Sequence, residues 1–184
     1  MAEKKKGKKK WYEVLASKHF NNIPVGESVA YEDKGLIGRV MKVNLGTLTR
    51  DAKLQNVRIK FKINEIKDEK AYTEVKGYEL SGSYVKRIMR AGISKIDDSF
   101  IITTKEGIKL KLKPLVLTKH KAQKNVLKGL RGLIRKEIND YIKNEVYDKF
   151  ISDLISKKIQ RDIRNKLSKI YPVGVVEIRM MERI

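Results

Sequence analysis

Apolar and polar residues alternate with a period of two through the middle of the chain, as they do in β-strands with one buried face. The clearest run covers residues 57–66. Its apolar positions are Val57, Ile59, Phe61 and Ile63, and basic or polar side chains fill the positions between them. The pattern predicts a strand with one dry face and one cationic face, and we expect residues 75–80 to pair with it.

Other segments carry weaker strand patterns. Residues 11–15 form a short apolar run, and residues 36–43 alternate again. The segments 93–103 and 107–117 predict a hairpin, because a polar turn with a glycine joins two apolar runs. Between the strands, residues 83–91 place apolar and basic side chains on opposite sides of a short helix.

The apolar period lengthens to 3.6 residues from about residue 121, which indicates helices. One apolar stripe covers residues 126–142, and a second covers residues 146–170. The register of the second stripe shifts near Ser156, so we expect the helical region to break or kink there. Pro172 then ends the helices, because proline cannot continue the backbone hydrogen bonds of a helix.

These elements predict an α+β fold with an antiparallel sheet. We expect residues 1–10, MAEKKKGKKK, to be a disordered lysine-rich tail, because they offer nothing to bury. The length of the rest suits a single domain, residues 11–184. Within it, residues 11–118 predict a β-rich core with one short helix, residues 119–171 the helices, and residues 172–182 a final strand.

The charge of the chain narrows the choice of partner. Lys and Arg number 43 against 22 Asp and Glu, which gives a net charge of +21 on 184 residues. An excess of this size repels itself on one compact domain unless a polyanion neutralises it. Nucleic acid is the commonest polyanion in cells, and an anionic membrane surface is the main rival. Codon bias can also enrich lysine, but it would ordinarily raise glutamate as well.

Other function classes find little support. The chain has no cysteine, and no apolar run approaches the length of about 20 residues that spans a bilayer, so we expect a cytoplasmic protein. His19 and His120 lack a second metal ligand at helical spacing. The pair Asp97-Asp98 fits a polar break beside a strand better than an acid–base pair, and no glycine-rich phosphate loop or nucleophile elbow is present. We therefore expect no enzyme, metal, cofactor, or small-molecule substrate, and no homo-oligomer.

Basic residues recur on the faces opposite the apolar ones, and these are the candidate contacts to RNA. They are Lys4, Lys5, Lys6, Lys8, Lys9, Lys10, Lys86, Arg87, Arg90, Lys124, Lys128, Arg131, Arg135, Lys157, Lys158 and Arg161. Trp11 and Arg39, which stand in segments discussed below, complete the set. A charge run is often only a solvated face, but here the runs share one sign on the tail, the strands and the helices. Aromatic residues make up only 7% of the chain, so the sequence favours phosphate contact over a folded RNA rather than sequence-specific reading of single strands.

The segment 124–135 shows the clearest separation of faces. Its basic residues recur at i, i+4, i+7 and i+11, which places all of them on one side of a helix about 17 Å long. Like charges in a row repel each other, so an RNA phosphate backbone explains the row better than stability does. A solvated face and a cover of neighbouring proteins remain the alternatives.

Several short motifs, in order and at matching spacing, resemble the archaeal and eukaryotic small-subunit ribosomal protein family S-three-a-e. They begin with Lys9-Lys10-Trp11-Tyr12 at the edge of the lysine tail. Further motifs are Gly38-Arg39-Val40 with Val43, Leu45 and Leu48, the strand Arg58–Ile63, Thr103-Thr104 with Gly107, Leu110, Leu112 and Thr118, Ile159 with Asp162-Ile163, and Ile170-Tyr171-Pro172 with Val176 and Arg179. The chain departs from the family pattern at Lys42, Asn44 and Thr47.

The resemblance implies a non-catalytic component of the small ribosomal subunit. It implies contacts with small-subunit rRNA on the platform, near the 3′ end of that RNA and the mRNA exit, and with neighbouring ribosomal proteins. The family fold it implies is a β-barrel-like core flanked by helices. The residues alone leave two other classes open, a DNA-compacting basic protein and an RNA-modification accessory protein.

Overall fold

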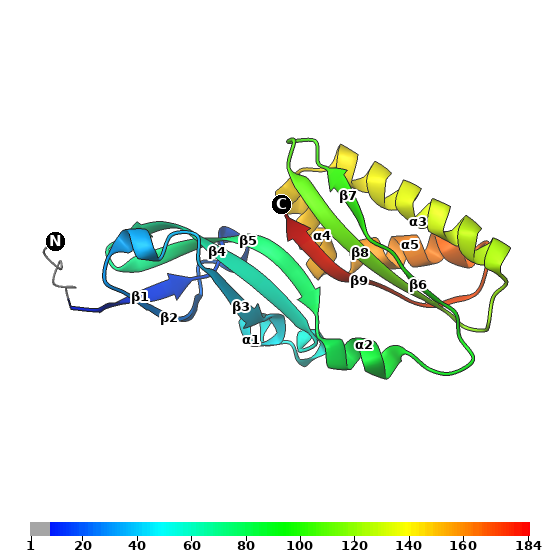
Figure 1. Ribbon diagram of the computed structural model, residues 1–184, viewed down its shortest axis with the longest axis horizontal. Helices are drawn as coiled ribbons and strands as arrows, with labels where there is room; N and C mark the ends of the chain where they lie inside the picture. The colour runs from blue at the N-terminus through cyan, green and yellow to red at the C-terminus, as the bar shows by residue number, and fades with distance from the viewer. Residues whose placement is uncertain (1–7) are drawn as a thin grey trace, which may run out of the picture. The chain divides into compact units, whose positions relative to one another are not determined.

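The computed structural model describes residues 8–184 (Figure 1). The chain divides into two compact units, the first ending at Gly77 and the second spanning Tyr78–Ile184. The single domain expected for residues 11–184 stays a prediction. Most of the tail expected to be disordered lies outside the described residues, although its last residue, Lys10, already belongs to the first strand.

The first unit is a sheet with short helical turns in its loops. Its strands are β1 (Lys10–Leu15), β2 (Pro24–Ala30), β3 (Val40–Asn44), β4 (Val57–Lys67) and β5 (Lys70–Leu80), the last of which continues past Gly77. They lie in the order β2-β1-β5-β4-β3. The turns are η1 (Lys18–Phe20), η2 (Asp33–Gly35), α1 (Leu45–Thr49) and η3 (Ala52–Leu54).

The sheet of this unit is mixed and open, which corrects the expected antiparallel barrel. Strand β1 pairs with β2 in the antiparallel direction but with β5 in the parallel direction. The edge strands β2 and β3 share no backbone ladder in the described part of the chain. A period of two marks a half-buried strand in either direction, so the pattern could not reveal this parallel pair.

The sequence located β4 well. Val57, Ile59, Phe61 and Ile63 are all buried, as their alternation predicts. The strand continues to Lys67 and turns into β5 through Asp68 and Glu69, which both have positive φ angles of 50° and 60°. Two left-handed residues in a row form the type I′ turn that suits tight hairpins.

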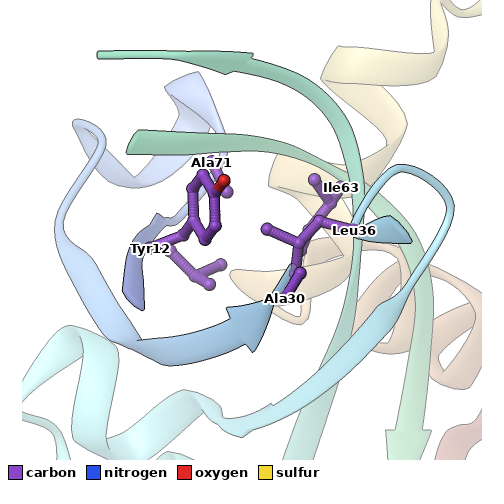
Figure 2. Packing of buried hydrophobic residues seen from close by; sticks show 6 residues of the cluster. Tyr12, Ala30, Leu36, Ile63 and Ala71 are labelled. Carbon is purple, nitrogen blue, oxygen red and sulfur yellow. The ribbon is translucent and has the colours of Figure 1, made fainter. Parts of the chain in front are cut away.

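A small cluster of buried apolar residues forms part of the core of the first unit (Figure 2). Tyr12, Ala30, Leu36, Ile63 and Ala71 meet there, contributed by β1, β2, the loop before β3, β4 and β5. Each of these side chains is at most 5% exposed. The Tyr12 hydroxyl also donates a 2.5 Å hydrogen bond to Asp33, which ties η2 to this core.

The second unit joins a sheet to four helices. Its strands are β6 (Lys95–Asp97), β7 (Phe100–Thr103), β8 (Lys109–Thr118) and β9 (Val173–Arg183). Strand β8 pairs antiparallel with β6, β7 and β9, so the expected hairpin is confirmed with an interruption at residues 98–99. The final strand is also confirmed, with bounds close to those that its pattern indicated.

The helices follow the apolar stripes. After α2 (Gly82–Ile88) come α3 (Lys124–Asn144), α4 (Tyr147–Ile155) and α5 (Lys158–Ser168). Helix α3 packs along α5, and α5 packs on β9 (Figure 1). The expected break near Ser156 is confirmed, because Lys157 takes a left-handed φ of 58° between α4 and α5.

Candidate nucleic-acid interface

Helix α3 presents the predicted basic row to solvent. Lys124, Lys128, Arg131 and Arg135 are all exposed, while Leu130, Ile134, Ile138 and Ile142 are buried on the opposite side. Within residues 8–184, Lys124, Lys128 and Arg131 form no ion pair with a carboxylate. The apolar stripe therefore anchors the helix and leaves three of the four cations unneutralised by the protein.

The position of Lys124 in the first turn of α3 is unfavourable for the helix itself. Lys124 is the first residue of the helix, the first turn holds no acidic residue, and Gln123 forms no side-chain cap. The N-terminus of a helix carries a partial positive charge, so basic side chains there cost rather than add stability. An anion placed at this end would interact favourably with both the dipole and the lysines.

Arg135 differs from the rest of the row because it has a partner inside the protein. Its Nε lies 2.9 Å from Oδ2 of Asp98, and its guanidinium lies 5.8 Å from the centre of the Phe100 ring. The hydrogen bond to Asp98 raises the pKa of Arg135. Asp97 is likewise paired, with Arg179 at 2.8 Å, so the Asp97-Asp98 pair serves as a polar break between β6 and β7.

A second basic surface, the β1–β2 face, lies around the start of β1 and the end of β2 in the first unit. Lys8, Lys9, Lys10 and Trp11 are all exposed there. The Lys9 ammonium lies 5.6 Å from the centre of the Tyr31 ring, and Lys10 forms a long ion pair of 3.9 Å with Glu69. Tyr31 is a member of this face that the sequence did not reveal.

Arg39 reaches the same region from the loop before β3. Its Nη1 donates to the backbone oxygen of Val29 at 3.0 Å and to Oγ of Ser28 at 3.3 Å. The backbone of Arg39 pairs with Ile63 of β4. Arg39 thus connects β4 with β2, while its side chain stays exposed.

The remaining predicted residues fall in two further places in the second unit. On and just after α2, Lys86, Arg87 and Arg90 are exposed, and Arg87 lies 5.4 Å from the Tyr84 ring centre. At the junction of α4 and α5, the cations are engaged by the protein itself. Lys157 bonds the buried Glu177 at 3.0 Å, Lys158 lies 3.8 Å from Asp153, and Arg161 donates to backbone oxygens of Ser156 and Lys157.

The structure therefore sorts the candidates by how much of their charge the protein already uses. Lys4, Lys5 and Lys6 lie outside the described residues. The α3 row, α2, and the β1–β2 face each bring several predicted residues together. Lys157, in contrast, already pairs with the buried Glu177 at the break between α4 and α5. Tyr31 was not among the candidates because Pro24 and Gly26 suggested a loop, and residues 27–31 show no alternation of apolar and polar positions.

Residues 8–184 offer no obvious setting for other chemistry. No three His, Cys, Asp or Glu side chains among them gather closely enough to hold a metal ion. In the same range, no helix is both long and apolar enough to cross a membrane. What the described surface offers is exposed positive charge, on a helix, on a sheet and beside aromatic rings.

Comparison with known proteins decides the family. The sequence model of the Ribosomal S3Ae family matches residues 2–184. The chain belongs to this family. It is therefore a ribosomal protein with a structural, non-enzymatic role, as the resemblance of its motifs implied.

The chain is similar in sequence to curated ribosomal proteins over nearly its whole length. The small ribosomal subunit protein eS1 of Methanothrix thermoacetophila is 34% identical over 174 residues, which cover 95% of this chain and 82% of the relative. The eS1 protein of Staphylothermus marinus is 35% identical over 170 residues, 92% of this chain and 80% of the relative. That of Methanopyrus kandleri is 32% identical over 178 residues, 95% and 84%.

Proposed function

We propose that this protein binds small-subunit rRNA on the platform of the small ribosomal subunit, near the 3′ end of the RNA and the mRNA exit, in the cytoplasmic ribosome. Its partners there are the rRNA and neighbouring small-subunit proteins. The family membership and the names of the relatives support the subunit. The location on the platform extends what the S3Ae resemblance implies.

The observation that carries the RNA-binding part is the row on α3. Three cations stand exposed without an acidic partner toward the positive end of a helix that is 21 residues long. Each phosphate neutralised by such a cation releases condensed counterions, which is the main source of affinity for nucleic acid. The lysines of the tail, α2 and the β1–β2 face add to the same surface charge.

Sucrose-gradient sedimentation tests the proposal. The tagged protein should co-sediment with small subunits at physiological salt and leave them only at high salt. Recovery mainly with free protein, or preferential binding to duplex DNA over rRNA in competition, would contradict the proposal and favour a DNA-compacting role.

The platform location needs a directed probe. The chain contains no cysteine, so Lys124→Cys creates a unique attachment point for a tethered cleavage reagent. Strand cleavage in small subunits should cluster near the 3′ end of the rRNA. Cleavage confined to other regions would overturn the location while leaving the ribosomal role intact.

A further inference from the structure

The outer face of β1 and β2 exposes aromatic side chains that folding does not need. Tyr12 and Ala30 point into the apolar cluster (Figure 2). Successive residues of a strand point to opposite faces, so Trp11 points outward, and Tyr31 follows directly after the last residue of β2. Trp11 is 65% exposed and Tyr31 is 44% exposed, although large aromatic residues usually bury most of their surface.

The strand register places Trp11 near the segment that carries Tyr31. Trp11 lies opposite Val29 and Lys10 lies opposite Ala30 in the antiparallel ladder. Residues on the same face of such a pair that are displaced diagonally lie about 7–8 Å apart, within reach of aromatic side chains. Tyr31 stands two residues beyond Val29, the partner of Trp11, and the Lys9 ammonium lies over the Tyr31 ring.

An open hollow of about 490 Å³ is lined by Tyr31 and by Val29, the strand partner of Trp11. Its walls are Lys9, Val29, Ala30, Tyr31, Glu32, Gly35 and Arg39. This volume falls in the range of about 300–1,000 Å³ that small-ligand sites occupy. Lys9 and Arg39 give the hollow two positive charges against the one negative charge of Glu32.

The walls of the hollow are held in place from inside the unit. The hydrogen bond from Tyr12 to Asp33 fixes η2, which carries Gly35. The hydrogen bond from Arg39 to the Val29 carbonyl fixes the opposite wall. A preformed wall loses little conformational entropy when a ligand enters, so the site suits binding without prior folding.

The chemistry of this face matches one unpaired nucleotide. Aromatic side chains stack on nucleobases largely without regard to sequence, and adjacent cations bind the flanking phosphates. Cations alone would suffice for a duplex, whose bases are already stacked. On the proposed rRNA-binding function, we infer that Trp11 and Tyr31 stack on a single unpaired RNA base, that Lys9 and Arg39 contact its phosphates, and that Glu32 accepts a hydrogen bond from an exocyclic amino group.

The chain supplies its own reporter for this contact. Trp11 is its single tryptophan, so stacking of a base on Trp11 should quench the intrinsic tryptophan fluorescence of the full chain. A short oligocytidylate is the probe, because cytosine carries an amino group for Glu32. An RNA duplex of the same length should bind the cationic surfaces without quenching.

Substitutions separate stacking from charge. Trp11→Ala and Tyr31→Ala should each weaken oligocytidylate binding about ten- to hundredfold, the range expected for one stacked base. Trp11→Phe should restore binding to within a few-fold. Ile101→Ala, which trims an equally exposed apolar side chain in the second unit, should change nothing. Oligocytidylate binding at wild-type affinity by both alanine variants, or equal quenching by duplex and single strand, would overturn the proposal.

The same variants distinguish this proposal from the proposed function. If wild-type protein fails to enter small subunits but oligocytidylate still quenches Trp11, the rRNA role fails and the base-stacking site stands. If Trp11→Ala binds naked rRNA like the wild type but enters small subunits poorly, a protein neighbour covers this face. That result would overturn the stacking proposal and leave the ribosomal role intact.

Discussion

The α3 row and the β1–β2 face both carry positive charge, but different side chains surround that charge. On α3, the exposed cations are accompanied by two exposed glycines, Gly129 and Gly132, and by no exposed ring. On the β1–β2 face, Lys9 and Arg39 line a hollow with Tyr31, and Trp11 is exposed on β1. Charge without exposed rings suits the phosphate backbone of a folded RNA, while charge with exposed rings suits an unstacked base. Net charge alone therefore does not describe how this protein meets RNA.

The largest effect is expected from truncating a core side chain of the first unit, which carries the β1–β2 face. Phe61 is fully buried in β4 and meets Phe20 edge-on, with ring centres 5.7 Å apart. Phe61→Ala should lower the free energy of unfolding by about 3–5 kcal/mol, because it leaves a cavity in the first unit. Urea denaturation measures the change. The matched variant Lys62→Ala, at the next and exposed position, should stay within about 0.5 kcal/mol, and equal destabilisation by both would contradict the assignment of faces.

Charge reversal on α3 comes next. The double variant Lys128→Glu/Arg131→Glu should fold normally, yet bind small-subunit rRNA about a hundredfold more weakly, or about 2.8 kcal/mol. Filter binding at fixed salt measures the change in affinity. Reversing Lys105 and Lys169, two exposed lysines elsewhere in the second unit, gives the same change in net charge. Equal weakening by both double variants would mean that only net charge matters.

Salt dependence sharpens the contrast between the two surfaces. Neutralising Lys128 and Arg131 with glutamine should lower the slope of log affinity against log salt by about 0.7–0.9 for each phosphate that the protein no longer neutralises. Trp11→Ala should weaken single-strand binding with an unchanged slope, because stacking releases no counterions. Titrations across a range of salt concentrations provide both slopes. A lower slope for Trp11→Ala would erase the distinction between the surfaces.

The exposed glycines of α3 predict a smaller effect of opposite sign. A Cβ at Gly129 or Gly132 would meet nothing within 4 Å. Gly129→Ala should therefore raise stability by about 0.5–1 kcal/mol, because glycine is the more flexible residue in the unfolded chain. Thermal unfolding measures this gain. If an RNA backbone lies closely against this side of α3, the added methyl group should also weaken rRNA binding, whereas a purely solvated face would leave affinity unchanged.

The smallest effect concerns Tyr12, whose hydrogen bond to Asp33 holds one wall of the hollow that Tyr31 lines. The hydrogen bond to Asp33 is the main cause that raises the pKa of Tyr12 from 10 to about 12. Because the folded state holds this proton more tightly, the stabilisation is complete below pH 10 and disappears as the pH rises through 12. Tyr12→Phe should remove this part of the pH dependence. Stability measured from about pH 9 to pH 12 would show it, and parallel curves for both proteins would contradict it.

The sequence by itself determined the elements whose apolar pattern is long and regular. Strand β4 and helix α3 follow directly from periods of 2 and 3.6, and the break between α4 and α5 follows from a shift in register. The exposure of the α3 row also followed, because the opposite stripe must be buried. The motifs alone indicate the S3Ae family.

Only the tertiary structure decided which strands pair and which charged side chains already have partners within the protein. Strand β1 lies parallel to β5, a contact between residues far apart in sequence that local patterns do not encode. Lys157 looked like any other surface lysine, but its side chain bonds the buried Glu177. Tyr31 lies beside Lys9 only because β2 folds back along β1, and this pairing assembles the ring-bearing face from residues that are distant along the chain.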